Sequence, residues 1–263
     1  MNFLMLKERI KNFLKQWRTL RDMSLSIDKA KYAGLKLGAW WVIIIPLVMA
    51  LCINFVFVLA FKVDLPYFAF FVLSAILPWF FISQAISESA NAFIAQKALL
   101  KQGIFPKEFI PSSTVLAAFL NFTYGFLAVI PLFLLINSSV IYLLPILLLV
   151  VILILVFALG LGFIFSSLNV FSRDIAYFLP VGLMFWFWAT PVFYSENMLA
   201  MPYRWFCLIN PATYYVSACR KILYYALPPE PLELVLMLLI SGVFLSCGYL
   251  FYLKNEPEIL KRI

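Results

Sequence analysis

Long uncharged stretches alternate with short charged segments along the whole chain. An α-helix rises 1.5 Å per residue and needs about 20 apolar residues to cross a hydrocarbon core of roughly 30 Å. Six stretches of 20 to 26 residues lack Asp, Glu, Lys and Arg, namely 39–61, 67–87, 113–136, 140–165, 175–194 and 234–253. None shows the alternation of a barrel strand. The pattern therefore predicts an all-α polytopic membrane fold with six transmembrane helices.

The segment before the first span, residues 1–37, has a helical pattern of its own. Apolar residues recur every three or four positions, with basic residues between them. The apolar set is Phe3, Leu6, Ile10, Phe13, Leu14, Trp17 and Leu20. This spacing favours an amphipathic interface helix on the inner leaflet over the alternative, a disordered basic arm. The chain thus divides into a cytoplasmic segment, 1–37, and a transmembrane domain, 38–263.

Residues 195–233, between the fifth and sixth spans, are neither an ordinary polar loop nor a full span. They contain a fifteen-residue uncharged run, 205–219, that Asn210 and Pro211 interrupt. A run of this length suits a re-entrant or interfacial helical hairpin that enters from the outer side. Such backbone at membrane depth must be enclosed by protein or line a water-filled cavity.

The connection between the second and third spans, residues 88–112, mixes charged and apolar side chains. Glu88, Lys97 and Lys101 are interleaved with apolar residues, and Pro106 lies near the end of the segment. This pattern favours a short amphipathic helix parallel to the membrane, which would present a docking surface to a cytoplasmic subunit. The alternative is a plain solvated connection.

Composition and charge distribution fix the class and the orientation. Hydrophobic residues make up 65% of the chain and charged residues 12%, with a mean hydropathy of +1.01. These values exclude a water-soluble fold. The chain has 20 Lys and Arg against 12 Asp and Glu. All but four of the basic residues lie in segments on the same side of the membrane as the two termini. The four exceptions are Lys62, Arg204, Arg220 and Lys221. The positive-inside rule therefore places both termini in the cytoplasm, and the basic excess indicates attraction to membrane lipids, with no nucleic-acid binding expected.

The chain offers little to catalysis. It has no His, so His-based nucleophilic pairs and the usual His metal sites are excluded, and we predict no catalytic residue and no metal site. It has no phosphate-binding G-x-x-x-x-G-K motif and no charge within the six stretches that could couple transport to an ion. A driven transporter of this composition needs a partner that hydrolyses nucleotide. Cys207 and Cys219 could form a disulfide on the outer side, although buried thiols are favoured.

Several ordered motifs resemble those of type 2 ABC exporter permeases, in the branch that exports O-antigen, teichoic acid and capsular polysaccharides. The similarity covers nearly the whole chain. The motifs are Lys31-Tyr32-Ala33-Gly34-Leu35-Lys36-Leu37-Gly38-Ala39-Trp40-Trp41, Leu77-Pro78-Trp79-Phe80-Phe81, Phe105-Pro106-Lys107-Glu108 with Pro111, Leu168-Asn169-Val170-Phe171-Ser172-Arg173-Asp174-Ile175, Thr190-Pro191-Val192-Phe193-Tyr194 and Asn210-Pro211.

This resemblance implies a homodimeric permease of the bacterial cytoplasmic membrane that works with two copies of a separate ABC ATPase subunit. ATP and Mg would bind to that partner, and this chain would bind no cofactor. The implied cargo is an undecaprenyl-diphosphate-linked glycan, and the outer hairpin would gate its exit. The N-terminal helix and the 88–112 loop would form the ATPase interface. The expected interface residues are Trp17, Glu88, Lys97, Lys101, Phe105, Pro106 and Asp174.

Candidate substrate-path residues lie around the fifth predicted span. Arg173 could contact the diphosphate of a lipid carrier, because guanidinium suits bidentate phosphate binding; alternatively, Arg173 and Asp174 fix the helix register or dock the ATPase. Trp186, Trp188, Tyr194 and Trp205 could stack on sugar rings, although Trp and Tyr also anchor helices at headgroup level. We assign no site to the polar residues inside the other spans, since such residues usually join helices.

Three other functions compete with glycan export. A type 2 permease for a drug or another lipid would have the same architecture. A membrane-embedded enzyme acting on lipid-linked sugars would need an acid, a base or metal ligands near the interface, and the chain offers only scattered carboxylates there. A passive scaffold would show no conformational change that depends on nucleotide.

Overall fold

The described residues form an all-α structure without β-strands. The computed structural model describes residues 9, 13, 15–60, 62, 65–102 and 105–263. Most of the predicted N-terminal interface helix, including Phe3, Leu6, Ile10 and Leu14, therefore lies outside the described residues. The α-helices of the described part are α2 (Trp17–Tyr32), α3 (Trp41–Phe55), α4 (Phe68–Ala90), α5 (Ala92–Ala95), α6 (Lys97–Gln102), α7 (Phe109–Ile136), α8 (Val140–Phe171), α9 (Asp174–Ala189), α10 (Arg204–Ile209), α11 (Pro211–Leu223) and α12 (Pro231–Arg262).

Within the described residues, five helical segments are long and apolar enough to cross a membrane. They correspond to five of the six predicted runs: Trp41–Val58, Phe68–Ala90, Phe109–Ile136, Val140–Phe171 and Pro231–Arg262. These are α3 with its π-helical continuation, α4, α7, α8 and α12.

The predicted span 175–194 is shorter as a helix than its uncharged run suggests. Helix α9 ends at Ala189, after 16 residues, and the backbone at Thr190 is extended, with ψ 133°. The cause is Pro191, because a proline disfavours the helical conformation of the residue before it and has no N–H to donate. The uncharged run thus consists of a short helix followed by non-helical chain.

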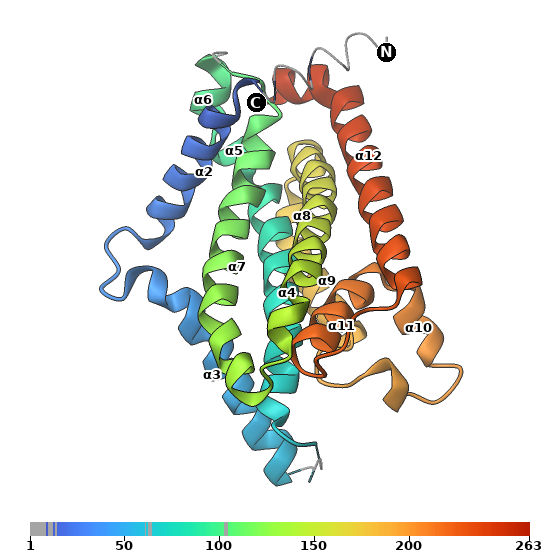
Figure 1. Ribbon diagram of the computed structural model, residues 1–263. Coiled ribbons are helices and arrows are strands. Elements are labelled where there is room, and N and C mark those ends of the chain that lie inside the picture. The colour runs from blue at the N-terminus through green and yellow to red at the C-terminus, as the bar shows by residue number, and fades with distance from the viewer. Residues whose placement is uncertain (1–8, 10–12, 14, 61, 63–64, 103–104) are drawn as a thin grey trace.

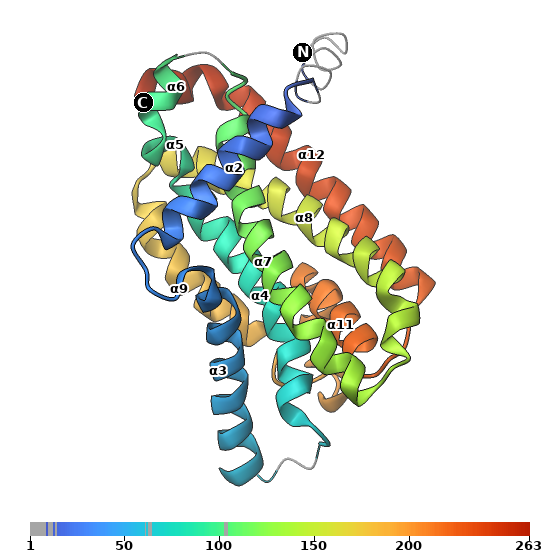
Figure 2. The same ribbon diagram turned by 60° about the vertical axis from the view of Figure 1, so that its left-hand side comes forward.

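The helices lie roughly side by side, and the shorter elements gather at two opposite ends (Figures 1 and 2). Helices α2, α5, α6 and the C-terminal part of α12 lie at one end, which we call the α2 end. Helices α10 and α11 lie at the other, which we call the hairpin end. This separation agrees with the sequence-based grouping of the segments into two sides.

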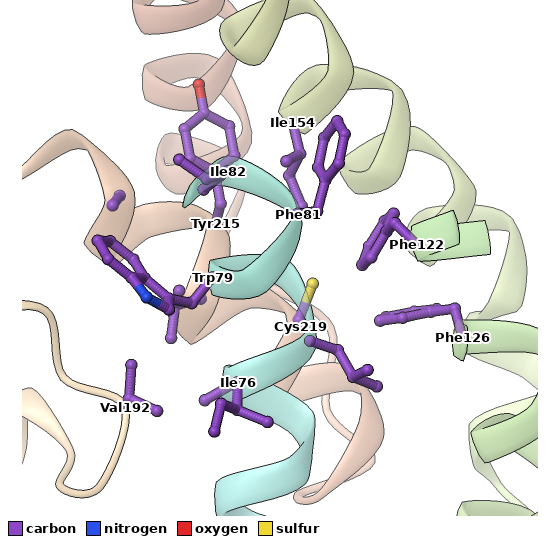
Figure 3. Close-up of a cluster of buried hydrophobic side chains, with 14 of the residues drawn as sticks. Ile76, Trp79, Phe81, Ile82, Phe122, Phe126, Ile154, Val192, Tyr215 and Cys219 are labelled. Carbon is purple, nitrogen blue, oxygen red and sulfur yellow. The ribbon is translucent and has the colours of Figure 1, made fainter. Parts of the chain in front are cut away.

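Helix α4 is the centre of the bundle. It packs against α7, α8, α3, α11 and α9, and most of its side chains are buried. Phe81 of α4 stacks on Phe122 of α7 with 5.1 Å between ring centroids. On another side of α4, Trp79 meets Trp186 of α9 edge to face at 5.5 Å. Figure 3 shows these apolar side chains projecting from α4 towards several neighbouring helices, so that α4 connects otherwise separate parts of the bundle.

Helices α8 and α12 form the most extensive helix pair, and glycines allow their close approach. A Cβ atom added to Gly248 would lie 2.1 Å from the carbonyl oxygen of Gly160, and one added to Gly160 would lie 2.4 Å from the backbone of Phe244. About two helical turns from Gly160 and Gly248, the Ser241 hydroxyl donates to the carbonyl oxygen of Leu153 at 2.9 Å. Small residues and side-chain hydrogen bonds of this kind hold helices together in lipid, where the hydrophobic effect between helices is weak.

Helix α2 shares only Trp17 and Leu20 with the apolar set predicted for the N-terminal segment, and most of that set lies outside the described residues. Leu20, Ser24 and Asp28 are buried at intervals of four residues, and α2 packs against α7. Trp17 is 50% exposed, although it was predicted on the apolar face. Arg9 and Phe13, two of the described residues before α2, contact Glu256 of α12 and Phe109 of α7 respectively.

The 88–112 connection contains two short helices rather than one. Helix α4 continues to Ala90, so Glu88 belongs to α4 and not to the loop. The helices α5 and α6 follow, with Phe93 and Leu100 buried and Lys97 and Lys101 exposed. The amphipathic pattern was predicted correctly, but the helix boundary was not, because a charged residue marks the edge of the apolar run and not the end of the helix.

Candidate functional site

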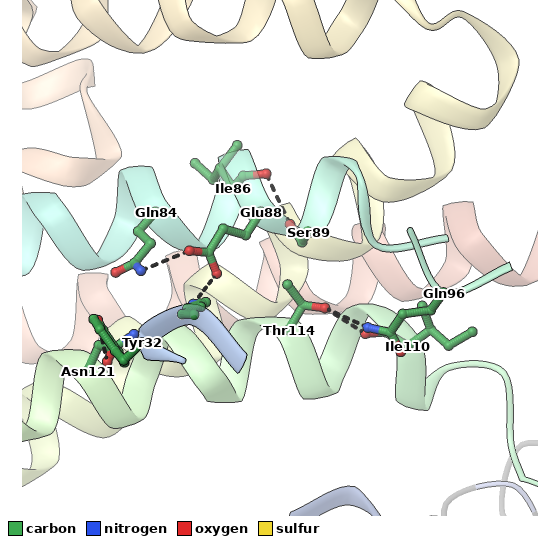
Figure 4. A network of polar contacts seen from close by, with 10 residues as sticks. Tyr32, Gln84, Ile86, Glu88, Ser89, Gln96, Ile110, Thr114 and Asn121 are labelled. Atoms are coloured by element: carbon green, nitrogen blue, oxygen red, sulfur yellow. Dashed lines mark hydrogen bonds and ion pairs between the residues drawn. The ribbon is translucent and has the colours of Figure 1, made fainter. Parts of the chain in front are cut away.

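A polar network joins α2 to the bundle at the α2 end (Figure 4). Lys31 of α2 forms an ion pair with Glu88 of α4, and Gln84 donates to the other Glu88 carboxylate oxygen at 2.9 Å. The Tyr32 hydroxyl donates to the Asn121 side-chain oxygen of α7 at 3.0 Å. Helices α2, α4 and α7 are therefore held together by charged and polar contacts as well as by packing.

Asp28 lies buried beside this network. Burial raises the pKa of its carboxyl group, an effect that the Lys31 ammonium opposes and the Glu88 carboxylate reinforces. Burial also raises the pKa of Tyr32 to about 12, so its hydroxyl keeps its proton and donates to Asn121 at neutral pH.

A second polar contact at the α2 end joins three segments that are far apart in sequence. Arg9 forms an ion pair with Glu256 of α12 at 2.8 Å, and Lys107 lies 4.0 Å from the same carboxylate. The Phe13 ring meets the Phe109 ring of α7 edge to face at 5.1 Å. A movement of the N-terminal segment would thus be transmitted directly to α7 and α12.

The same segments enclose a recess of about 200 Å³. Its lining residues are Arg9, Phe105, Pro106, Lys107, Glu108 and Glu256. Burial raises the pKa of the Glu108 carboxyl, against the effect of its own backbone N–H and of the Arg9 guanidinium. The predicted interface residues Phe105 and Pro106 are half-buried in this wall rather than freely exposed.

The predicted ATPase-interface residues fall into two groups. Trp17, Lys97 and Lys101 are exposed at the α2 end, as are the apolar side chains Ile94 and Leu99 of α5 and α6. We call these five residues the docking surface. Of the others, Glu88 lies within the polar network, Phe105 and Pro106 line the recess, and Asp174 is exposed at the start of α9.

Asn169 of α8 has a structural role that the sequence did not reveal. Its side-chain nitrogen donates to the carbonyl oxygen of Ala90 at 2.9 Å and to the Asn91 side chain at 3.2 Å. Its side-chain oxygen accepts the backbone N–H of Ala176 at 3.1 Å. One fully buried amide thereby joins the ends of α4 and α8 to the start of α9. The sequence feature that could have indicated this structural role is the presence of an Asn within the long apolar segment of α8.

At the hairpin end, Asn210 connects α9 to the hairpin. Its side-chain oxygen caps α11 by accepting the Ala212 backbone N–H at 3.0 Å, and it also accepts the indole N–H of Trp186 at 2.8 Å. Its side-chain nitrogen donates to the Thr190 hydroxyl at 2.9 Å and to the Ala189 carbonyl at 3.2 Å. The Asn210-Pro211 break is thus a helix cap as well as a helix boundary.

Arg220 of α11 holds the non-helical chain that follows α9. Its guanidinium is 2% exposed and donates to the carbonyl oxygens of Pro191 (2.6 Å), Val192 (2.7 Å) and Tyr194 (2.9 Å). It also lies 4.0 Å from the centre of the Phe71 ring of α4. Burial lowers the pKa of Arg220 to about 10, so the group remains charged at neutral pH. Buried backbone carbonyls that lack partners in a helix need such donors.

The five predicted path residues separate into exposed and bound side chains. Arg173, Trp188 and Trp205 are exposed, the two tryptophans by 57% and 58%. Trp186 is bound to Asn210, and the Tyr194 hydroxyl donates to the Trp188 carbonyl oxygen at 3.2 Å. Trp186 and Tyr194 therefore hold local structure, whereas Arg173 and Trp205 are exposed and the partly exposed Trp188 ring packs against Phe187 and Phe193.

Helix α9 presents an unusually exposed apolar face. Leu179 is its one buried residue. Exposed large side chains recur along it at helical spacing, namely Tyr177, Phe178, Val181, Met184, Phe185 and Trp188.

The four cysteines are unpaired, with Cys207 and Cys219 buried, as the favoured interpretation of the sequence expected. No group of three or more acidic or Cys residues that could hold a metal occurs among the described residues.

The fold and its two ends define a multi-pass α-helical membrane protein with a polar network at one end and a helical hairpin at the other. A family model described as ABC-2 type transporter matches residues 28–224, and the chain therefore belongs to this family. ABC-2 permeases lack an ATPase domain and work with an ABC ATPase subunit.

Similar proteins are O-antigen export permeases. The chain is 29% identical over 199 residues to an O-antigen export system permease protein RfbA of Klebsiella pneumoniae, covering 74% of this chain and 75% of that protein. It is 26% identical over 244 residues to an O-antigen export system permease protein RfbA of Myxococcus xanthus, covering 89% and 91% of the two chains.

Proposed function

We propose that this chain is the permease subunit of an ATP-driven exporter that moves an undecaprenyl-diphosphate-linked polysaccharide, such as O-antigen, teichoic acid or capsule, outward across the bacterial cytoplasmic membrane. The observation that carries this proposal is the similarity to O-antigen export permeases, which covers 74% of the chain in one comparison and 89% in another. A permease for a drug or another lipid is the alternative that shares this architecture.

In this proposal α9 is the fifth of six spans. Its 16 residues cover about 24 Å, less than a hydrocarbon core of roughly 30 Å. The following chain from Thr190 to Tyr194 completes the crossing. Arg220 supplies hydrogen bonds to three of its carbonyl groups, and Asn210 donates to the Thr190 hydroxyl and to the Ala189 carbonyl at the end of α9. Six spans place both termini on the cytoplasmic side, with α10 and α11 forming a hairpin that enters from the outer side.

The α2 end is the proposed contact with the ATPase subunit. The docking surface combines two exposed lysines with apolar side chains, and the Arg9–Glu256 and Lys31–Glu88 pairs connect its neighbourhood to α12 and α4. Two ATPase copies would bind ATP and Mg and act on two permease copies, and this chain would bind no cofactor. We expect contacts with membrane lipids and none with nucleic acid.

The exposed face of α9 is the proposed path and pairing surface of the homodimer. A short helix with a single buried residue would be stabilised by a protein neighbour, because the unpaired backbone groups at its ends would otherwise lie in lipid. Trp188 and Trp205 offer aromatic faces to sugar rings, and Arg173 at the start of α9 offers a guanidinium to the diphosphate.

The test is reconstitution of the chain with its cognate ABC ATPase subunit in lipid nanodiscs. ATP hydrolysis should rise when lipid-linked glycan is added and should not respond to undecaprenyl phosphate alone. Stimulation by drugs or phospholipids in place of glycan would favour the alternative permease and reject glycan export.

A further inference from the structure

The hairpin end contains a cavity of about 430 Å³ that none of the contacts described above explains. Three segments enclose it: the loop after α9, one side of α11, and the connection from α11 to α12. Its lining residues are Ser195, Glu196, Asn197, Ser217, Arg220, Lys221, Tyr225, Leu227, Pro228 and Glu230. This volume lies within the range of about 300 to 1,000 Å³ that is typical of small-molecule sites.

The charges of the lining balance. Arg220 and Lys221 are positive, and Glu196 and Glu230 are negative. Both cations are already engaged: Arg220 binds backbone carbonyl groups, and Lys221 forms an ion pair with Glu233. An anionic ligand would have to compete with these contacts, although the buried Arg220 Nε has no hydrogen-bond partner, and the balanced charge of the lining favours a neutral ligand.

The hydrogen-bonding groups of the lining are mixed, with an excess of acceptors. Glu196 accepts the Ser217 hydroxyl on one carboxylate oxygen at 3.0 Å, which leaves its other oxygen available. The Asn197 side chain is exposed and offers both a donor and an acceptor. Carboxylate oxygens accept hydrogen bonds from O–H groups, so a ligand rich in hydroxyl groups can bind to these lining residues.

One aromatic ring completes the lining. Tyr225 is 43% exposed and packs edge to face against Tyr224, with 4.9 Å between the ring centroids. This contact fixes the orientation of the Tyr225 ring, while its free surface can pack against C–H groups. Carboxylate acceptors, an amide and an aromatic face together match a pyranose sugar, which has hydroxyl groups around its edge and C–H groups on its faces.

We propose that this cavity binds a neutral pyranose unit on the outer side of the membrane. The inference rests on the proposed function for the origin of that sugar, which would be a unit of the polysaccharide emerging beside the hairpin. Glu196 and Asn197 bind its hydroxyl groups, and Tyr225 packs against its C–H face. Arg220 acts as a positioning residue, because it binds the chain that carries Ser195 and Glu196 to α11.

Saturation-transfer NMR tests the site directly, since the method detects weak sugar binding. The permease–ATPase complex in nanodiscs is mixed separately with the methyl glycosides of mannose, galactose, rhamnose and N-acetylglucosamine, and empty nanodiscs serve as the blank. At least one glycoside should receive saturation from the wild-type complex. Tyr225→Ala should weaken that binding by about three- to tenfold, because it removes one ring contact. Tyr225→Phe should preserve it.

Controls separate this site from other surfaces. Tyr203 is 63% exposed, lies outside the cavity lining, and provides the matched variant Tyr203→Ala, which should leave the signal unchanged. Asn197→Ala supplies an independent lining variant and should also weaken binding. Choline and inorganic phosphate, as cationic and anionic probes, should show no contact that depends on Tyr225.

The proposal is overturned if no glycoside shows Tyr225-dependent saturation, or if choline or phosphate shows it instead. Stimulation of ATP hydrolysis by lipid-linked glycan is measured on the same preparations. A complex that responds to lipid-linked glycan but fails the NMR test retains the proposed function and loses this site. A complex that binds pyranosides through Tyr225 but does not respond to lipid-linked glycan retains the site and loses the proposed export function.

Discussion

The indole N–H of Trp186 donates a hydrogen bond of 2.8 Å to the side-chain oxygen of Asn210, and so ties α9 to the cap of α11. Asn210 returns two hydrogen bonds, to the Thr190 hydroxyl and to the Ala189 carbonyl. The end of α9 and the start of α11 are therefore parts of one rigid connection. A ligand-induced movement of α9 would displace the hairpin with it.

Replacing Trp186 with Phe should destabilise the protein while leaving the apolar packing nearly intact. The substitution removes the donor to Asn210, and loss of one such hydrogen bond costs about 1 to 2 kcal/mol. Trp188→Phe is the matched control, because Trp188 is 57% exposed and should change stability by less than about 0.5 kcal/mol. Thermal unfolding in detergent measures both. Equal unfolding temperatures for the two variants would show that the Trp186–Asn210 bond contributes nothing.

Arg220→Met should be among the most destabilising substitutions at the hairpin end. It leaves the carbonyl groups of Pro191, Val192 and Tyr194 without a partner, at a cost of about 3 kcal/mol or more. Arg220→Lys should recover part of this loss, because a single ammonium cannot reproduce the planar set of guanidinium donors. Arg204→Met on α10 is the control. Stability of the Arg220→Met protein equal to that of wild type would contradict the role given to this side chain.

Gly248→Ala should disrupt the contact between α8 and α12. The added Cβ would lie 2.1 Å from the Gly160 carbonyl oxygen, so the two helices must separate. We expect a loss of about 1 to 3 kcal/mol, as for other overpacked sites. Gly242→Ala on the same helix meets nothing within 4 Å and should be tolerated. The pair would be compared by thermal unfolding, and equal tolerance of both would refute the close crossing.

Charge reversal on the docking surface should separate assembly from folding. Lys97→Glu with Lys101→Glu places two negative charges on exposed positions of α6, so the unfolding temperature should change little. Recovery of the ATPase subunit in affinity purification should fall at least several-fold. Lys62→Glu, also exposed but far from α6 in the fold, is the control. Undiminished recovery with the double variant would move the interface elsewhere.

The membrane helices and their grouping could be predicted from the sequence, because a helix that crosses lipid needs about 20 residues without charged side chains. Five of the six uncharged runs correspond to long apolar helices of the described part. The end of α9 was missed, although Pro191 and its effect on Thr190 were visible in the sequence. Glu88 was misplaced because the charge was taken as the end of α4, whereas the helix continues to Ala90 and the carboxylate is paired with Lys31.

The roles of individual site residues were harder to predict. Arg220 was counted as one of four basic residues on the outer side, and its partners are backbone carbonyl groups 26 to 29 positions earlier, which no residue pattern marks. Trp186 was predicted in the substrate path by its type, and the hydrogen bond of its indole N–H to Asn210 could not be predicted from that type alone. Contacts between distant segments decide such roles.

Transport by reconstituted proteoliposomes is the most direct measurement of the central claim. The permease and its cognate ATPase subunit are reconstituted with the nucleotide-binding side outward, and lipid-linked polysaccharide is followed into the lumen. Entry should require ATP, Mg and the ATPase subunit together, and should stop when the ATPase is replaced by a variant that cannot hydrolyse ATP. Entry catalysed by the permease alone, or no entry with the complete and active complex, would contradict this account.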